Sequence, residues 1–186
     1  MGIGPVTRPL RRAVFLDRDG VLNRAVIRNG KPYPPATLDE FELLPDAVSA
    51  LPSLRSRGFL LCVVTNQPDV RRGTQRQSVV EAMHEVLRHH LPLDGIYVCY
   101  HDDPDGCHCR KPKPGLLIDA AAEHDICLES SYLIGDRWRD VDCGHAAQCT
   151  TILIDRGYDE RLRKHPHFRA PDLVAAAAII FSLEGD

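Results

Sequence analysis

Five short apolar runs rich in β-branched residues alternate with stretches of helical periodicity, and this alternation constrains the fold more than any other feature. The expected strands cover residues 13–17, 59–65, 96–100, 131–135 and 151–155. The expected helices cover residues 46–57, 74–90, 115–124, 138–147 and 171–183. Pro52 lies inside the first helical stretch and is expected to kink or delay it. Strands that alternate with helices predict a parallel sheet covered on both faces, a three-layer α/β fold of the Rossmann type.

Length and charge limit the classes of protein to which the chain can belong. Its 186 residues and formal net charge of −3 suit one compact domain, residues 1–186 with a core at about 12–157, without a general affinity for nucleic acid. No apolar run approaches the ~18 residues of a membrane helix, and the N-terminus lacks the apolar segment of a secretory signal. Seven cysteines, an odd number, favour a reducing compartment. We expect a cytoplasmic monomer with a small-molecule partner and no nucleic-acid or membrane partner.

Residues 22–36 interrupt the alternation. The segments 25–27 and 31–33 flank Asn29-Gly30, a pair typical of a two-residue type I′ turn. We expect a β-hairpin that acts as a flap, and a surface loop is the alternative.

Four polar motifs each follow an expected strand. They are Asp17-Arg18-Asp19-Gly20, Thr65-Asn66-Gln67, Arg110-Lys111-Pro112-Lys113-Pro114-Gly115, and Gly135-Asp136-Arg137 with Asp140 a turn later. The carboxyl ends of parallel strands share one edge of the sheet, so these residues are expected to converge in one crevice.

The chemical types of these residues are complementary. Asp17 and Asp136 offer the oxygen ligands that Mg²⁺ prefers, while Thr65 and Lys111 offer a hydroxyl and a positive charge to a phosphate. A cation and a lysine around a phosphoryl group stabilise an in-line displacement. Each motif alone has a structural alternative, such as a turn or a helix cap. All four in order favour a phosphate site.

The ordered motifs resemble those of the haloacid dehalogenase (HAD) superfamily of phosphohydrolases, over about residues 12–157. The resemblance implies that Asp17 is the nucleophile and that Asp19 protonates the leaving oxygen and then activates water. It also implies Mg²⁺ held by the Asp17 and Asp136 side chains and the Asp19 carbonyl, with Thr65 and Lys111 on the transferring phosphoryl group. No segment between motifs is long enough for a large cap domain. Asp140 either orients the metal's water shell or lies on a helix surface.

A second cluster consists of soft metal ligands. Cys99, His101, Cys107 and Cys109 match a closed tetrahedral Zn²⁺ site, and a loop of free thiols is the alternative. His108 is expected to point away, and the acidic residues between the two pairs are expected to be solvated. The zinc loop, residues 99–109, runs directly into Arg110-Lys111, so a structural zinc ion is expected to position both cations.

The full set of motifs resembles the D,D-heptose 1,7-bisphosphate phosphatases and the related histidinol-phosphate phosphatases. This implies that Asn66, Arg110 and Arg137 contact the substrate, with Arg18 a further candidate. Pro68-Asp69 departs from the family's small Ser-Gly pair, and the zinc loop is short.

We expect hydrolysis of a heptose bisphosphate. Histidinol-phosphate hydrolysis, a polynucleotide 3′-phosphatase and a zinc-stabilised binding module without catalysis are the alternatives. His84 has no partner motif and is expected to be a surface or packing residue.

Overall fold

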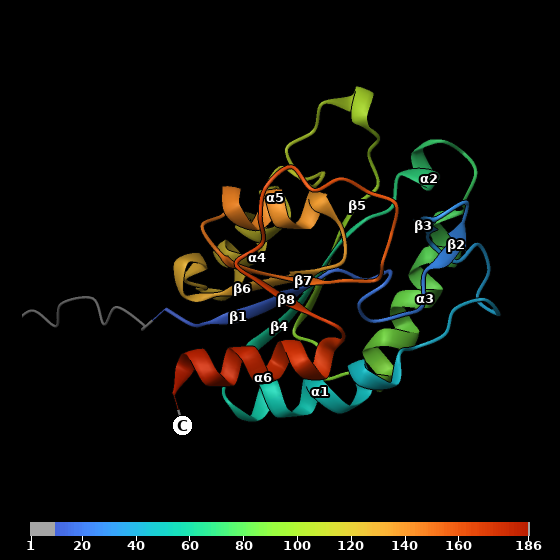
Figure 1. Ribbon diagram of the computed structural model, residues 1–186. Helices are drawn as coiled ribbons and strands as arrows, with labels where there is room; N and C mark the ends of the chain where they lie inside the picture. The colour runs from blue at the N-terminus through green and yellow to red at the C-terminus, as the bar shows by residue number, and fades with distance from the viewer. Residues whose placement is uncertain (1–9, 186) are drawn as a thin grey trace, which may run out of the picture.

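A computed structural model describes residues 10–185. Six strands form one parallel sheet in the order β5-β4-β1-β6-β7-β8 (Figure 1). Their bounds are β1 Ala13–Leu16, β4 Leu60–Asn66, β5 Gly95–Cys99, β6 Tyr132–Gly135, β7 Thr150–Ile154 and β8 Phe168–Ala170. The helices are α1 Pro45–Ser56, α2 Pro68–Arg71, α3 Gln77–His90, α4 Gly115–His124, α5 Trp138–Ala146 and α6 Leu173–Glu184. The expected parallel α/β sheet is therefore confirmed.

Side chains of the central strands alternate between two apolar layers, as the pleat requires. Val14 and Leu16 of β1 face a cluster that includes residues of α1 and α6. Ala13 and Phe15 face the opposite cluster, which includes residues of α4 and α5. Figure 1 shows the same arrangement, with α1 and α6 below the sheet and α4 and α5 above it. The molecule thus has the three layers that the sequence predicts.

Three expectations need correction. The helix expected at 74–90 begins only at Gln77, because the short helix α2 and a turn precede it. Helix α1 begins at Pro45 and continues through Pro52, so the expected delay is wrong. Burial of Ala47, Leu51 and Leu54 against the sheet stabilises this helix despite the missing proline N–H. Strand β8 was not expected. It has only three residues and pairs only with β7 at the edge of the sheet, so its sequence carries too short an apolar pattern to predict a strand.

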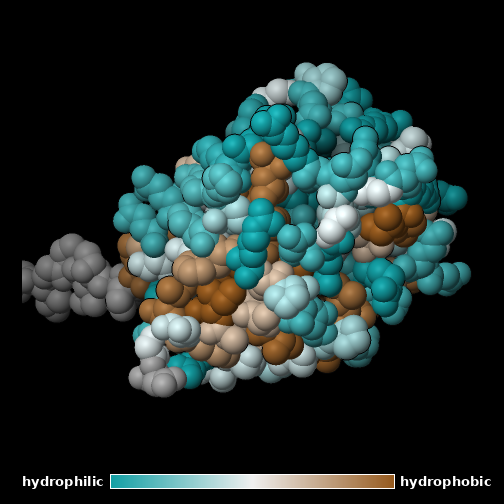
Figure 2. Space-filling model, in the orientation of Figure 1, coloured by the Kyte–Doolittle hydropathy of each residue, from teal (hydrophilic) through white to brown (hydrophobic). Residues whose placement is uncertain are grey.

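The hairpin is formed by β2, Val26–Arg28, and β3, Lys31–Tyr33. Asn29 and Gly30 have φ values of 51° and 73°, the left-handed pair that a type I′ turn requires. Within residues 10–185 no segment builds a separate cap domain, and none of the helices is long and apolar enough to cross a membrane. On the face shown in Figure 2, apolar surface gathers near α6, while the end with residues 99–109 is hydrophilic.

Candidate active site

The carboxyl ends of β1, β4 and β6 bring three of the four polar motifs together. Asp17 follows β1 directly, and its N–H donates to the carbonyl of Ile134 in β6 at 2.9 Å. Thr65 and Asn66 end β4, which pairs with β1 on the other side. Asp136 follows β6. The convergence expected from parallel strands is therefore present in the structure.

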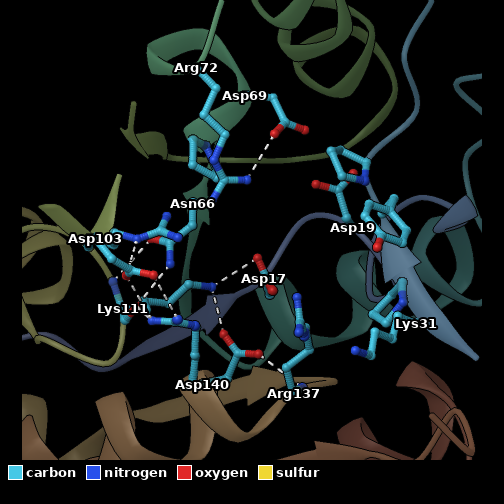
Figure 3. Close-up of a pocket in the computed structure, with 16 residues that line it drawn as sticks. Asp17, Asp19, Lys31, Asn66, Asp69, Arg72, Asp103, Lys111, Arg137 and Asp140 are labelled. Carbon is cyan, nitrogen blue, oxygen red and sulfur yellow. Dashed lines mark hydrogen bonds and ion pairs between the residues drawn. The ribbon is translucent and has the colours of Figure 1, made fainter. Parts of the chain in front are cut away.

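Lys111 supplies the fourth motif and occupies the centre of the group. Its Nζ atom lies 2.9 Å from Asp17 Oδ1 and 2.6 Å from Asp140 Oδ1, and it also donates to the carbonyl of Val64 at 2.8 Å. Figure 3 shows the lysine between the two carboxylates. Burial alone would lower the pKa of Lys111, but Asp140 and Asp17 raise it above its ordinary value. The lysine therefore stays charged although it is 98% buried, with 2% of its surface exposed.

Asp140 is a buried member of the site, so a position on the helix surface is excluded. One oxygen accepts from Lys111, and the other accepts from the backbone N–H of Arg137 at 3.1 Å, which caps α5. Burial of Asp17, and then the negative charge of Asp140, raise the pKa of Asp17 to about 7, against the opposing effect of Lys111. Asp17, Asp136 and Asp140 thus lie around a single lysine, Lys111, so the cluster has more acidic than basic groups.

Asp136 shows where a cation fits. Both of its carboxylate oxygens are buried and make no hydrogen bond of ordinary geometry within residues 10–185, although the nearby hydroxyl of Tyr158 acts to lower the pKa of this carboxyl. Burial, and then the nearby Asp17, raise the pKa of Asp136 well above its usual range. Ligand oxygens of Asp17, Asp136 and Asp140 lie within 4.8 Å of one another. A buried carboxylate without a donor is costly, so this donor set fits a hard divalent cation such as Mg²⁺.

Two glycines leave space for these carboxylates. Gly20 has φ +87°, and a Cβ atom there would lie 1.8 Å from Asp136 Oδ2. A Cβ atom at Gly135 would lie 2.2 Å from the Cβ of Asp140. The carbonyl of Gly20 also accepts from Arg156 Nε at 2.9 Å, which fixes the turn after β1. Close approach of backbone to side chain thus requires glycine at both positions.

Asp19 lines the cavity beside Asp17. Its carboxylate accepts from Asn23 Nδ2 at 3.0 Å and from Gln67 Nε2 at 2.8 Å, as well as from the guanidinium of Arg18. Arg18 is fully buried and lies behind Asp19. The expectation of Arg18 as a further candidate for a substrate contact is therefore wrong, because its side chain is directed into the protein.

A cavity of about 280 Å³ lies in front of Asp17 and Lys111. The hairpin contributes Lys31, Pro32 and Tyr33 to its wall, so the expected flap does border the site. The segment after β4 contributes Asp69 and Arg72, which Figure 3 shows across the cavity from Lys111. The cavity therefore offers a charged, open wall that suits a small anionic ligand.

Two of the residues expected to bind phosphate or substrate lie at the end of β4. The side chain of Asn66 lines the cavity and exchanges two hydrogen bonds with the backbone of Lys111, at 3.0 and 3.1 Å. Thr65 is almost fully buried, does not line the cavity, and accepts from Gln67 Nε2 at 3.0 Å. Asn66 therefore also holds the segment that carries the lysine.

Arg110 and Arg137 both line the cavity, and each has an acidic partner that the sequence did not reveal. Arg110 Nε donates to Asp103 Oδ1 at 2.8 Å, and Arg139 binds the other oxygen of Asp103 at 3.2 Å. The guanidinium of Arg137 pairs with Glu160. Arg139 and Glu160 were missed because no local motif marks them.

The zinc loop brings its four expected ligands together. Ligand atoms of Cys99, His101, Cys107 and Cys109 lie within 4.8 Å of one another. The Sγ atoms of Cys99 and Cys109 are 3.1 Å apart. His108 lies outside this group, with Nε2 3.5 Å from Asp119. Such a set of three sulfurs and one imidazole fits a closed tetrahedral Zn²⁺ site.

The acidic residues of the loop are not simply solvated, which corrects the expectation. Asp102 binds Arg72 at 2.7 Å, Asp103 binds Arg110, and Asp105 binds Arg71 at 3.1 Å. The zinc loop is thereby tied to the cavity wall.

The fold and the site define a hydrolase of the HAD-like class. A family model described as HAD-hydrolase-like matches residues 108–177, which carry the lysine and the second group of carboxylates.

Relatives narrow this class. The chain is 37% identical over 149 residues to a D-glycero-beta-D-manno-heptose-1,7-bisphosphate 7-phosphatase of Helicobacter pylori, covering 77% of this chain and 83% of the relative. It is 33% identical over 190 residues to a D-glycero-D-manno-heptose-1,7-bisphosphate 7-phosphatase of Thermosynechococcus vestitus, covering 91% and 94%. The crystal structure of D,D-heptose 1,7-bisphosphate phosphatase from B. bronchiseptica, complexed with magnesium and phosphate, matches with TM-score 0.79 and 28% identity, covering 94% of this chain and 99% of that one.

The chain therefore belongs to the heptose-bisphosphate phosphatase family of HAD-like hydrolases, and it is a phosphoric monoester hydrolase.

Proposed function

We propose that this enzyme removes the 7-phosphate of D-glycero-D-manno-heptose 1,7-bisphosphate in a Mg²⁺-dependent reaction. The observation that carries the proposal is the contact of Lys111 with Asp17 and Asp140 beside the unpartnered carboxylate of Asp136. The names of the relatives support the substrate.

In the proposed reaction Asp17 attacks the phosphorus of the 7-phosphate. A bond forms between an Asp17 oxygen and phosphorus, and the bond from phosphorus to the sugar oxygen breaks. Asp19 gives its proton to that leaving oxygen. Asp19 then takes a proton from water, whose oxygen bonds to phosphorus while the bond from phosphorus to Asp17 breaks, so that inorganic phosphate is released and Asp17 is restored. The position of Asp19 on the cavity wall beside Asp17 supports these two proton transfers.

Charge stabilisation comes from Lys111 and from the cation. Lys111 would contact the transferring phosphoryl group, and Thr65, buried behind the cavity wall at the end of β4, would support the site through Gln67. The carboxylates of Asp17 and Asp136, with the carbonyl of Asp19, would hold Mg²⁺. This ion would offset the repulsion between Asp17 and the phosphate oxygens.

The zinc loop has a structural role in this proposal. Zn²⁺ bound by Cys99, His101, Cys107 and Cys109 would leave no open coordination position. Asn66, Arg110 and Arg137 would contact the substrate from the cavity wall, which all three line.

We also propose that the chain works as a single-domain cytoplasmic monomer on this small substrate, without a nucleic-acid partner. The seven cysteines, all of them free, support a reducing compartment.

Histidinol phosphate is the second candidate substrate, favoured by the short zinc loop. The test compares kcat/KM for heptose 1,7-bisphosphate and histidinol phosphate in Mg²⁺, with phosphorus NMR to identify the remaining phosphate. We expect at least about a hundredfold preference for the heptose, a size that several contacts to a second phosphate can supply. A preference of similar size for histidinol phosphate, or release of the 1-phosphate, would overturn the proposal.

A further inference from the structure

A fully buried arginine lies directly behind the proposed proton-transfer residue. Arg18 has no exposed surface, and its Nη2 atom donates to Asp19 Oδ1 at 2.8 Å and to Oδ2 at 2.9 Å. Its Nε atom adds a third contact, to Oδ1 at 3.2 Å. A guanidinium removed from water requires such a charged partner. The rear of the Asp19 carboxylate is thus held by a rigid group, while Asp19 itself borders the cavity.

The remaining side of that guanidinium meets a buried histidine on α3. His84 is also fully buried, and its Nε2 atom lies 3.4 Å from Arg18 Nη1. Burial and the charge of Arg18 lower the pKa of His84. A neutral imidazole accepts at one nitrogen and donates at the other. The contacts fit Nε2 as the acceptor from Arg18 and Nδ1–H as the donor to Glu81, whose Oε2 atom is 3.3 Å away.

The outer end of this chain of contacts is anchored on the zinc loop. The other carboxylate oxygen of Glu81 accepts from the hydroxyl of Tyr100. Tyr100 stands between the expected zinc ligands Cys99 and His101. His84 is therefore fixed from both sides, by Arg18 within the protein and by Glu81 toward the loop.

We propose that Arg18 and His84 are positioning residues, which hold the Asp19 carboxylate in the orientation from which it moves the proton to and from the reacting oxygen. The inference rests on the proposed function, since it takes the proton-transfer duty of Asp19 from there. A side chain displaced by about 1 Å can lose roughly a hundredfold in rate, so a rigid support behind Asp19 has a direct kinetic value.

The test exploits the leaving group. A sugar alkoxide needs a proton as it departs, whereas nitrophenolate leaves without one, so loss of a positioned acid harms the first substrate selectively. His84→Leu removes the acceptor for Arg18 at similar volume. We expect kcat/KM to fall about tenfold or more for heptose 1,7-bisphosphate and less than about threefold for p-nitrophenyl phosphate. His84→Gln keeps an acceptor and is expected to recover most of the loss.

Matched variants make each outcome decisive. His89→Leu changes an exposed histidine of the same helix and is expected to leave both substrates unaffected. His84→Met removes the acceptor with a more adaptable side chain, should the leucine variant not fold. Equal losses on both substrates, or no loss on the sugar phosphate, would show that His84 only fills space.

Asp19→Asn, measured in parallel, separates the proton-transfer role of Asp19 from the positioning role of Arg18 and His84. If Asp19→Asn loses much more kcat/KM on heptose 1,7-bisphosphate than on p-nitrophenyl phosphate and the His84 variants do not, the positioning inference alone is wrong. If Asp19→Asn itself does not discriminate, the proposed duty of Asp19 fails and the inference fails with it. A crystal structure of His84→Leu should also show the Asp19 carboxylate turned from its present orientation, and an unmoved carboxylate would contradict the inference.

Discussion

Asp17 follows β1, whereas Asp136 and Asp140 follow β6 more than a hundred positions later in the sequence; the four ligands of the zinc loop, in contrast, come from one continuous stretch. The first cluster is therefore positioned by strands of the sheet. In the second cluster Cys99 ends β5, but the rest of the loop is shaped by the short 3₁₀ turn Asp103–Asp105 and by surface ion pairs and hydrogen bonds.

The two clusters also differ in what they hold in place. Lys111 is bound by Asp17, by Asp140 and by the carbonyl of Val64, all of which belong to the sheet or to α5. Arg110 depends on Asp103 and on the carbonyl of His101, which belong to the loop. The expectation that zinc positions both cations is therefore refined, because only Arg110 relies on the loop. Loss of zinc should affect substrate binding more than chemistry.

The largest expected effect comes from the sheet-borne cluster. Asp17→Asn should reduce phosphate release by at least about a thousandfold, because the amide is not a nucleophile. The fold and the zinc content should remain as in the wild type, measured by circular dichroism and metal analysis. Asp39→Asn, an exposed change of the same kind, serves as the control. Undiminished turnover by a folded Asp17→Asn enzyme would rule out the nucleophilic role.

The next effect tests the loop. Cys107→Ser should lose zinc and reduce kcat/KM for heptose 1,7-bisphosphate by about 10- to 100-fold, the usual range for a disturbed metal environment. Most of this loss should appear in KM, with kcat for p-nitrophenyl phosphate little changed, because Lys111 keeps its own supports. Cys127→Ser, which alters a half-buried thiol outside the loop, provides the matched control. A zinc-free variant with full turnover would contradict the role of the loop.

A smaller effect concerns the wall of the cavity. Glu160→Gln removes the negative charge that pairs with Arg137, and the guanidinium should become less well fixed. We expect KM to rise about three- to tenfold at unchanged kcat, since the pair is partly exposed. Glu42→Gln makes the same change in the exposed pair with Arg24 and should have no kinetic effect. A fall in kcat without a change in KM would assign Glu160 a different task.

The smallest effect is on stability. In protein loaded with zinc but free of Mg²⁺, the pKa of Asp17 is raised by burial from 3.8 to about 7, and that of Asp136 is raised as well. The folded state then binds more protons than the unfolded chain, so stability should fall as the pH rises from about 4 to about 7. Asp136→Asn should raise the melting temperature at pH 7 by a few degrees, about 1–2 kcal/mol.

Mg²⁺ sharpens this stability test. Added Mg²⁺ should stabilise the wild type and should stabilise the Asp136→Asn variant much less. Thermal melts at several pH values, with and without the ion, make the measurement. A zinc-loaded, Mg²⁺-free wild type that gains stability between pH 4 and pH 7 would show that these carboxylates are not destabilising one another.

The features that the sequence predicted are those encoded locally. Apolar runs located the central strands, Asn29-Gly30 located the hairpin, and three of the four polar motifs lie at the carboxyl end of a strand. Parallel topology then brings Asp17 and Asp136 to one edge of the sheet, and Lys111 reaches them from the segment that follows the zinc loop.

Features that depend on distant partners were missed or left open. Asp140 was left between two interpretations, because its burial depends on Lys111, 29 positions away in the sequence. The ion pairs of Arg137 with Glu160 and of Arg110 with Asp103 follow from tertiary packing, which no local periodicity records. The burial of Arg18 was missed for the same reason, since its partner His84 lies on a helix 66 positions further on.

The left-handed glycine after Asp19 has a consequence for how such a site can change over time. Any other residue at position 20 would place a carbon atom 1.8 Å from an oxygen of Asp136, within the space that this carboxylate occupies. A library randomised at that codon and selected for turnover should return glycine almost alone. A design that moves this centre into a new scaffold must therefore keep a glycine at this position as well as the acidic groups.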